Sequence, residues 1–367
     1  MELTPAELRQ FAFGGTIGAI APQPGGHINR SYRVETAGPA GPGIFLVQRV
    51  NASVFQHPAA LMANIAAITR HIAGLDPEAT ALLPAQHRIM LVPTTSGQQW
   101  LEAQDGSVWR AFPHIAGATH ARAAQPSQAR VAGLAFGAFL GLMDSYSGEA
   151  LAQTLPHFHD TSWYFDELER VAAVDPQGRF AGAEPEFRAC LAQRALASAL
   201  PHAGTEGVRQ RVVHNDAKIA NVLFDRAYGD PLAVIDLDTT MPGSAFADAG
   251  DLLRSMASPT SEDEGDLSKV RAEPALVEAV LEGWYEGAGE ALSHTERSGA
   301  VLAGCVITLE QAVRFLADHL AGDVYYQVAD PAHNLRRART QLALLASMLT
   351  QRASFERRAA RHITSTG

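Results

Sequence analysis

The sequence has little cysteine, no long apolar run and no excess of positive charge. Its only cysteines, Cys190 and Cys305, lie far apart, which argues against a disulfide scaffold or a cysteine-rich zinc site and fits a reducing compartment. The longest apolar stretch, residues 131–143, is too short and too rich in glycine to span a bilayer. The formal net charge of −10 disfavours general binding to nucleic acid. We therefore expect neither a nucleic-acid nor a membrane partner.

The chain opens with the pattern of a helix start rather than that of a signal peptide. Thr4 is placed as the cap, Pro5 falls in the first turn, and Glu7 lies three residues after the cap. With 47% hydrophobic and 19% charged residues over 367 positions, the chain is globular and long enough for two lobes with their own cores. A cytoplasmic protein is expected. Its oligomeric state is left open, and a monomer is compatible with the sequence.

One stretch, residues 211–225, carries the chemistry. Apolar residues enter it and leave it, which predicts a short strand, a tight polar loop and a second short strand. The loop offers a carboxylate at Asp216, a cation at Lys218 and an amide at Asn221. Phosphoryl transfer uses a carboxylate to orient the attacking hydroxyl, a cation to stabilise developing charge and an amide oxygen to hold Mg²⁺. The Asp-to-Asn spacing equals that of the protein-kinase loop H-R-D-L-x-x-x-N.

A buried-looking strand that ends in acids follows this loop. Residues 233–235 run into Asp236 and Asp238, where the second metal ligand of such an enzyme is expected. Asp236 is therefore predicted to bind Mg²⁺, and Asp238 either to bind metal as well or to hold the loop. Four residue types at set spacing arise by chance in well under about one chain in a hundred. A polar turn capped by Asp216 is the weaker interpretation.

The first third of the chain predicts a small sheet with one helix. The expected strands cover residues 16–20, 31–35, 44–50, 88–92 and 107–115, and the helix covers 58–73. Gly25, Gly26 and His27 lie in the loop after the first strand, where free N–H groups can meet ATP phosphates. An ordinary hairpin turn explains these glycines equally well. Pro113 and Ile115, which lead into the hinge, are also expected to contact ATP.

Beyond a hinge at residues 116–119 the pattern turns helical. Helices are expected over 130–143, 161–173, 184–200, 248–255, 274–289, 298–320 and 331–350, with an acidic surface loop over 258–274 and a frayed basic tail from Arg352. The expected fold is α+β and bilobal, like that of protein kinases. Residues 1–115 would form a small antiparallel-sheet lobe with one main helix, and residues 116–367 a larger, mostly helical lobe.

The chain resembles the aminoglycoside-phosphotransferase-like kinases, and within them most closely the N-acetylhexosamine 1-kinase branch. The matching segments are 45–51, 158–160, 214–225, 234–243, 248–251, 314–318 and 333–341, so the resemblance covers both expected lobes. It implies an ATP- and Mg²⁺-dependent kinase that phosphorylates the anomeric hydroxyl of N-acetylglucosamine, N-acetylgalactosamine or a close relative. By position it implies Asp216 as the catalytic base and Asn221 and Asp236 as metal ligands. It places Asn51, Thr239 and Arg314 in the sugar pocket.

Arg314 also has a simpler interpretation. Glu310 and Asp318 lie four residues to either side of it, so all three share one stripe of a helix. A surface ion-pair ladder, worth a few tenths of a kcal/mol per pair, has the same pattern. The resemblance favours a sugar-binding Arg314 held by these neighbours, with Asp318 counted in the acceptor site.

Gln48 departs from the protein-kinase pattern, in which a third-strand lysine pairs with a helix glutamate. Gln48 stands at the lysine position, Arg49 follows on the opposite strand face, and the helix over 58–73 contains no glutamate. We expect either that Asn64 meets Gln48 or that Arg49 reaches the ATP phosphates. Asp251 is expected to anchor backbone N–H groups around the catalytic loop.

Two alternatives stay open. The same fold could phosphorylate an aminoglycoside, another sugar, choline or homoserine, and the acidic loop over 261–266 keeps a polycationic acceptor possible. A nucleotide- or sugar-binding pseudokinase is supported only by the missing lysine–glutamate pair. The presence of Asp216, Asn221 and Asp236 speaks against it, because a binding module needs neither a base nor two metal ligands.

Overall fold

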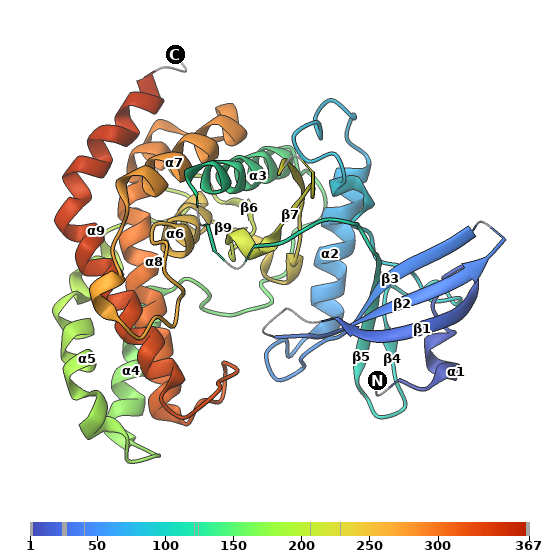
Figure 1. Ribbon diagram of the computed structural model, residues 1–367, viewed down its shortest axis with the longest axis horizontal. Helices are drawn as coiled ribbons and strands as arrows, with labels where there is room; N and C mark the ends of the chain where they lie inside the picture. The colour runs from blue at the N-terminus through green and yellow to red at the C-terminus, as the bar shows by residue number, and fades with distance from the viewer. Residues whose placement is uncertain are drawn as a thin grey trace.

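The computed structural model describes residues 3–23, 28–39, 41–120, 122–123, 125–205, 207–227 and 229–364. Figure 1 shows a β-sheet at one end of the molecule and a helical body at the other, with helix α2 (Pro58–Ala73) between them. This arrangement confirms the expected α+β, protein-kinase-like architecture, with a small antiparallel sheet followed by a mostly helical remainder.

The sheet has five antiparallel strands in the order β1-β2-β3-β5-β4. They are β1 (Thr16–Gln23), β2 (Arg30–Gly38), β3 (Gly41–Arg49), β4 (Leu101–Glu102) and β5 (Val108–Pro113). The short helix α1 (Pro5–Leu8) precedes them and starts with the expected capping box, in which the Glu7 N–H donates to the Thr4 hydroxyl at 3.2 Å. In the register of β3 and β5, Gln48 lies opposite Arg110, so the two side chains are cross-strand neighbours.

The strand expected over residues 88–92 is wrong. A short 3-10 turn ends at Arg88, and no strand follows it before β4. Gln86 explains the difference: its side-chain amide donates to the Val234 carbonyl at 3.0 Å and accepts the Val234 N–H at 2.7 Å. These bonds tie the segment to the helical body, and a hydrophobic run alone does not reveal such a tether.

Helix α2 has the bounds expected from its apolar spacing. Leu61, Ile65, Ile68 and Ile72 are buried, but they belong to the large core of the helical body. The sheet has a separate core that includes Val34, Val47 and Trp109. The α2 helix is therefore bound to the helical body on its apolar face, and the sheet lies on its other side (Figure 1).

Most helices of the body match the expected ranges within a few residues. They are α3 (Pro126–Asp144), α4 (Thr161–Val174), α5 (Phe180–Ala192), α6 (Ala245–Met256), α7 (Pro274–Ala288), α8 (His294–Ala321) and α9 (His333–Thr364). Helix α8 is long and apolar enough to cross a membrane, but 89% of its most apolar window is buried inside the protein. It serves as the central core helix of the body, as Figure 1 shows.

Two helix ends differ from expectation. The predicted helix over 184–200 starts earlier and ends at Ala192, with a short 3-10 turn following. The tail from Arg352, expected to fray, continues α9 to Thr364. Phe355 and Ala359 are buried in the core, and Arg358 pairs with Glu278 of α7 at 2.7 Å, so tertiary contacts hold a segment whose composition alone predicts fraying.

The catalytic stretch lies between two small antiparallel pairs. Strand β6 (Arg211–Val213) pairs with β9 (Met241–Gly243), and β7 (Val222–Phe224) pairs with β8 (Pro231–Val234). The predicted strand–loop–strand is confirmed, although the strands on either side of the loop pair with other strands. Both pairings bring the acids after β8 next to the loop after β6. Helix α3 lies beneath, where the rings of Phe136 and Phe139 pack edge-on against His214.

Candidate active site

A cavity of about 540 Å³ lies between the sheet and the helical body. This volume is within the range typical of small-molecule sites. The residues that line it from the sheet side include Gln48, Arg110, Phe112, Pro113 and Ile115, and those from the helical body include Asp216, Asn221, Asp236, Asp238 and Thr239. Half of the site residues predicted from the sequence therefore meet at one place, although they come from segments far apart in the chain.

Asp216 is held by the two residues that the loop pattern singled out with it. Its Oδ2 accepts hydrogen bonds from the Lys218 ammonium at 2.7 Å and from the Asn221 side-chain amide at 3.0 Å. Burial acts to raise the pKa of Asp216, but the Lys218 charge outweighs it and the pKa is lowered. Asp216 is thus a carboxylate at neutral pH. Its other oxygen has no hydrogen-bond donor within the described residues and is available to an acceptor hydroxyl.

Asn215 sets the direction in which Asp216 points. Its φ of 62° lies in the left-handed region, which asparagine tolerates better than most residues. The Asn215 side-chain amide donates to the carbonyl oxygen of Thr239 at 3.0 Å, and the Thr239 hydroxyl donates to the carbonyl oxygen of His214 at 2.7 Å. The loop after β6 and the turn after β8 are therefore fastened to each other.

Asp248 of α6, rather than Asp251, anchors the catalytic loop. Its two carboxylate oxygens accept the backbone N–H groups of His214 at 3.0 Å and Asn215 at 2.7 Å. The expectation for Asp251 was wrong: its carboxylate accepts from Arg254 at 2.7 Å. One turn of helix separates the two acids, so the sequence alone could not tell which one faces the loop.

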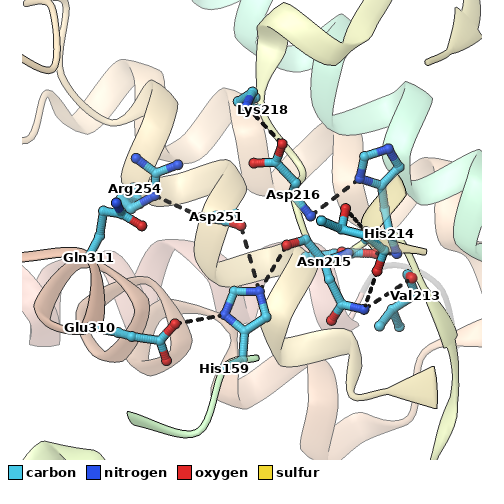
Figure 2. A network of polar contacts seen from close by, with 12 residues as sticks. His159, Val213, His214, Asn215, Asp216, Lys218, Asp251, Arg254, Glu310 and Gln311 are labelled. Carbon is cyan, nitrogen blue, oxygen red and sulfur yellow. Dashed lines mark hydrogen bonds and ion pairs between the residues drawn. The ribbon is translucent and has the colours of Figure 1, made fainter. Parts of the chain in front are cut away.

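His159 braces the same loop from the other side (Figure 2). Its ring contacts the carbonyl oxygen of Asn215, the carboxylate of Glu310 and, at 3.9 Å, Asp251. Figure 2 shows how Asp251 lies between His159 and Arg254, so that a chain of charged groups runs beneath the loop. Sequence reasoning did not predict this bracing role, although His159 lies in one of the matching segments.

Asn221 and Asp236 fit the ligand set of a Mg²⁺ ion. The main-chain carbonyl oxygen of Asn221 accepts the Ile235 N–H at 2.9 Å. Because Ile235 directly precedes Asp236, this bond holds Asp236 beside Asn221. The Asn221 side-chain oxygen and the Asp236 carboxylate have no hydrogen-bond donor in the part of the chain that the structure describes. Desolvation inside the cleft and the nearby Asp238 charge raise the pKa of Asp236 to about 7. A hard cation would relieve this repulsion, and Mg²⁺ takes few protein oxygens besides substrate phosphates.

Asp238 is engaged by the sheet instead of being open to a metal. Its Oδ1 accepts from the Arg110 guanidinium at 2.5 Å and its Oδ2 from the Asn29 side-chain amide at 2.6 Å. Its side chain is only 5% exposed. Of the two roles expected for Asp238, the placement favours holding the structure together. Arg110, its partner, is a cavity residue that sequence reasoning missed.

The residues proposed to contact ATP, other than Arg49, separate into two groups. Gly25, Gly26 and His27 lie outside the described residues. Gln48, Pro113 and Ile115 line the cavity.

The two expected substitutes for the lysine–glutamate pair are absent from the cavity. Asn64 does not meet Gln48, because its side chain is hydrogen-bonded to the backbone of Ala152. It donates to the Ala152 carbonyl oxygen at 2.8 Å and accepts the Ala152 N–H at 2.9 Å. Arg49 is not among the residues that line the cavity. It lies 4.0 Å from Asp105, because successive residues of a strand face opposite sides of the sheet.

Of the four residues proposed for the sugar pocket, only Thr239 lines the cavity. Asn51 instead supports the loop after β3: its N–H donates to the Asn29 side chain at 3.0 Å and its side chain accepts from the Ser53 N–H at 3.1 Å. Asp318 accepts the backbone N–H groups of Val324 and Tyr325 at 2.9 and 2.8 Å, which holds the turn between α8 and α9.

Arg314 lies inside a box of aromatic rings rather than in the cavity. Its guanidinium carbon is 5.0 to 5.9 Å from the ring centres of Phe158, Tyr164, Tyr325 and Tyr326. Glu310 is 3.8 Å away, and only 11% of the Arg314 side chain is exposed. The surface ion-pair ladder is therefore wrong, since both Arg314 and Glu310 are largely withdrawn from solvent.

Comparison with known proteins agrees with this geometry. Residues 19–292 match the model of the APH phosphotransferase enzyme family, so this kinase-like chain belongs to that family. Three solved structures with the same fold are an aminoglycoside phosphotransferase from Alicyclobacillus acidocaldarius, a spectinomycin phosphotransferase in complex with ADP and spectinomycin, and a choline/ethanolamine kinase family protein from Mesorhizobium loti. Their sequence identities to this chain are 13%, 12% and 16%, and their TM-scores are 0.58, 0.55 and 0.55.

These structures match along almost their whole length. The alignments cover 96%, 92% and 98% of this chain and 97%, 94% and 97% of the three solved chains, in the same order. At these low identities the likeness establishes the fold alone. The acceptor of this chain has to be argued from its own residues.

Proposed function

We propose that this protein transfers the terminal phosphoryl group of ATP, bound as its Mg²⁺ complex, to a hydroxyl group of a sugar. The observation that supports this most is the convergence of Asp216, Asn221 and Asp236 on one cavity, each with an oxygen left without a donor among the described residues. A carboxylate base beside two oxygen ligands for Mg²⁺ is the set that phosphoryl transfer requires.

Each residue has a role that follows from its contacts. The free oxygen of Asp216 accepts the proton of the acceptor hydroxyl, while its other oxygen stays fixed by Lys218 and Asn221. Asn221 and Asp236 hold the metal, which supplies positive charge against the phosphates. The Lys218 ammonium, at 2.7 Å from Asp216, keeps the base ionised and adds positive charge beside the reacting oxygens.

We further propose that the acceptor is the anomeric hydroxyl of an N-acetylhexosamine. The motifs shared with the N-acetylhexosamine 1-kinase branch, which extend over both the sheet and the helical body, are the main support. Because Thr239 is the only cavity-lining member of the expected sugar contacts, this finer assignment depends on those motifs more than on the geometry.

The charges of the protein disfavour the polycationic alternative. Of the four acids in the loop over 261–266, two pair with cations outside it: Glu262 with Arg254 at 2.6 Å and Asp266 with Lys269 at 3.2 Å. This pairing reduces the attraction that the loop offers to an aminoglycoside.

The aromatic residues disfavour a choline-type acceptor. Among the described residues, one box of aromatic rings surrounds a cation, and that cation is Arg314. Quaternary ammonium groups bind in cages of aromatic rings. The rings around Arg314 are already occupied by its guanidinium, so the protein's own cation fills that cage.

An acceptor panel tests the proposal. N-acetylglucosamine, N-acetylgalactosamine, glucose, choline, homoserine and an aminoglycoside are each incubated with ATP and Mg²⁺, and ADP release is measured. We expect turnover with an N-acetylhexosamine, with a product whose phosphate is on the anomeric carbon by ³¹P NMR. The matched control Asp216→Asn should lose about 10²- to 10⁴-fold in kcat.

The outcomes separate the alternatives. Turnover of choline, homoserine or an aminoglycoside, without turnover of the sugars, overturns the acceptor assignment and leaves the kinase proposal in place. Binding of MgADP without turnover of any acceptor supports the pseudokinase. Activity that is unchanged in Asp216→Asn contradicts the role assigned to the base.

A further inference from the structure

The sheet lacks any lysine that could contact the nucleotide phosphates. Lysine occurs in this sequence only at positions 218 and 269, so none precedes the catalytic loop. Protein kinases supply a cation to the phosphates from a lysine on the third strand of the sheet. Gln48 stands at that position, and the neighbouring Arg49 lies outside the cavity near Asp105.

A different cation occupies the corresponding face of the sheet. Arg110 on β5 is directly across from Gln48 in the strand register, and both side chains line the cavity that holds Asp216, Asn221 and Asp236. The Arg110 Nε donates to the Gln48 Oε1 at 3.0 Å. The Gln48 Nε2 in turn donates to the Ser31 hydroxyl at 3.0 Å, which fixes the orientation of the amide.

Asp238 holds the opposite side of the same guanidinium. Its Oδ1 accepts from Arg110 Nη1 at 2.5 Å, and the two side chains are only 2% and 5% exposed. Arg110 Nη2 has no hydrogen-bond partner within the described residues, so this nitrogen can donate to a ligand while Nε and Nη1 stay held. Burial matters because a charge–charge interaction is much stronger there than at the surface.

We propose that Arg110 is the cation that the sheet contributes to the phosphates of the bound nucleotide. Gln48 and Asp238 are its positioning residues and take the part that a helix glutamate plays for the lysine of protein kinases. The chemistry suits the role, since a guanidinium has five N–H donors in a fixed fork that matches phosphate oxygens. The proposal rests on the proposed function only in requiring that a nucleotide binds in this cavity.

Nucleotide binding without any acceptor provides the test. The dissociation constants of adenosine, MgADP and the non-hydrolysable analogue MgAMP-PNP are measured by calorimetry for the wild type and for Arg110→Met. Loss of one charged hydrogen bond predicts about 10- to 100-fold weaker binding of the two phosphorylated ligands. Adenosine has no phosphate, so its affinity should not change. The matched control Arg49→Met removes a cation from the adjacent strand on the other face and should bind all three ligands like the wild type.

A second variant distinguishes loss of the Arg110 contact from general loss of folding. Arg110→Met leaves Asp238 as an unpaired buried charge, which destabilises proteins. The double variant R110M/D238N removes that charge and should recover much of the lost thermal stability, while MgADP binding stays as weak as in R110M. Recovery of MgADP affinity in the double variant would overturn the proposal, because the effect would then come from folding.

The positioning role of Gln48 has its own readout. Gln48→Ala should weaken MgADP by a smaller factor, about 3- to 10-fold, without affecting adenosine. Gln48→Glu retains an acceptor for Arg110 Nε and should restore the affinity. Equal losses for adenosine and MgADP in Gln48→Ala would instead indicate a general change in the sheet and would contradict positioning.

Failure of this proposal can be told apart from failure of the proposed function. If the wild type binds MgADP tightly and Arg110→Met binds it equally well, Arg110 does not contact the phosphates although the kinase assignment stands. If the wild type binds no adenosine nucleotide in calorimetry, both the kinase assignment and the role of Arg110 are wrong.

Discussion

His159 donates a hydrogen bond from its Nε2 to the main-chain carbonyl oxygen of Asn215, 2.9 Å away. Its Nδ1 lies 3.1 Å from the Glu310 carboxylate. Both partners are acceptors, so each ring nitrogen carries a proton and the imidazole is a cation. Burial acts to lower the pKa of His159, but Glu310 and the other contacts outweigh it and raise the pKa to about 9. The catalytic loop therefore rests on a buried positive charge.

This brace predicts a specific dependence of stability on pH. The pKa of His159 is about 9 in the folded protein and about 6.5 in the unfolded chain. The group contributes its stability fully below about pH 6.5, and that contribution is lost as the pH rises through about 9. It amounts to roughly 3 kcal/mol. Urea unfolding of the wild type and of His159→Gln at pH 6, 7.5 and 9 measures it.

The difference between the two proteins is the quantity that matters, because other groups also titrate. We expect the stability advantage of the wild type over His159→Gln to be largest at pH 6 and to shrink towards pH 9. Two unfolding curves that stay parallel over this range would show that His159 is neutral in the folded protein.

Asp248 should affect catalysis more than nucleotide binding. Asp248→Ala leaves the backbone N–H groups of His214 and Asn215 without their acceptor, at a cost of about 1–3 kcal/mol for each. Because these groups set the loop that carries Asp216, we expect kcat to fall by about 10- to 100-fold, while the dissociation constant of adenosine is unchanged. Steady-state kinetics, thermal denaturation and calorimetry measure the three quantities.

Asp248→Asn serves as the graded control, since an amide retains one acceptor oxygen. Its kcat and melting temperature should lie between those of the wild type and of Asp248→Ala. If Asp248→Ala folds with wild-type stability and kcat, the loop must be held by other contacts, of which His159 is the strongest candidate.

Local patterns explain why much of the fold was predictable. Strands β2 and β3 follow from alternation of side chains, and α2 follows from apolar residues at helical spacing. The Asp216-to-Asn221 offset within one loop carries the chemistry in a form that a sequence displays directly. Each of these signals depends on residues close together in the chain, where the geometry is set by the backbone.

Long-range contacts explain what was missed. Arg110 and Asp238 are 128 residues apart, and only the folded chain shows that they meet. The choice between Asp248 and Asp251 depends on which side of α6 faces the loop. The end of α9 is helical because Phe355 and Ala359 are buried, although its composition favours a frayed tail.

Asp236 should link metal and nucleotide. Asp236→Asn removes a charged oxygen ligand, so we expect the Mg²⁺ concentration for half-maximal activity to rise at least about tenfold and kcat to fall. Without metal, we expect the substitution to favour nucleotide binding instead of impairing function. In EDTA the variant should bind ADP at least as tightly as the wild type, because one negative charge near the phosphates is gone. Calorimetry with and without Mg²⁺ makes the comparison, and weaker ADP binding in EDTA would contradict a metal-binding role.

The close contact between α3 and α7 beneath the site should be intolerant of any side chain. A Cβ at Gly283 of α7 would lie 1.9 Å from the carbonyl oxygen of Arg130 and 2.8 Å from the Leu134 nitrogen. Both atoms are main chain of α3, so the helices would have to separate. Gly283→Ala should therefore lower the free energy of unfolding by about 2–4 kcal/mol, despite the better helix propensity of alanine.

Gly141 on α3 provides the matched control for that substitution. A Cβ there would meet its nearest atom, the Gly287 carbonyl oxygen, at 3.8 Å, which is an ordinary contact. Gly141→Ala should be neutral or stabilising by up to about 1 kcal/mol, because alanine loses less backbone freedom on folding. Chemical denaturation of both variants compares them directly. Equal effects would mean that helix propensity governs both positions, and that the interhelical backbone contact does not limit the side chains allowed there.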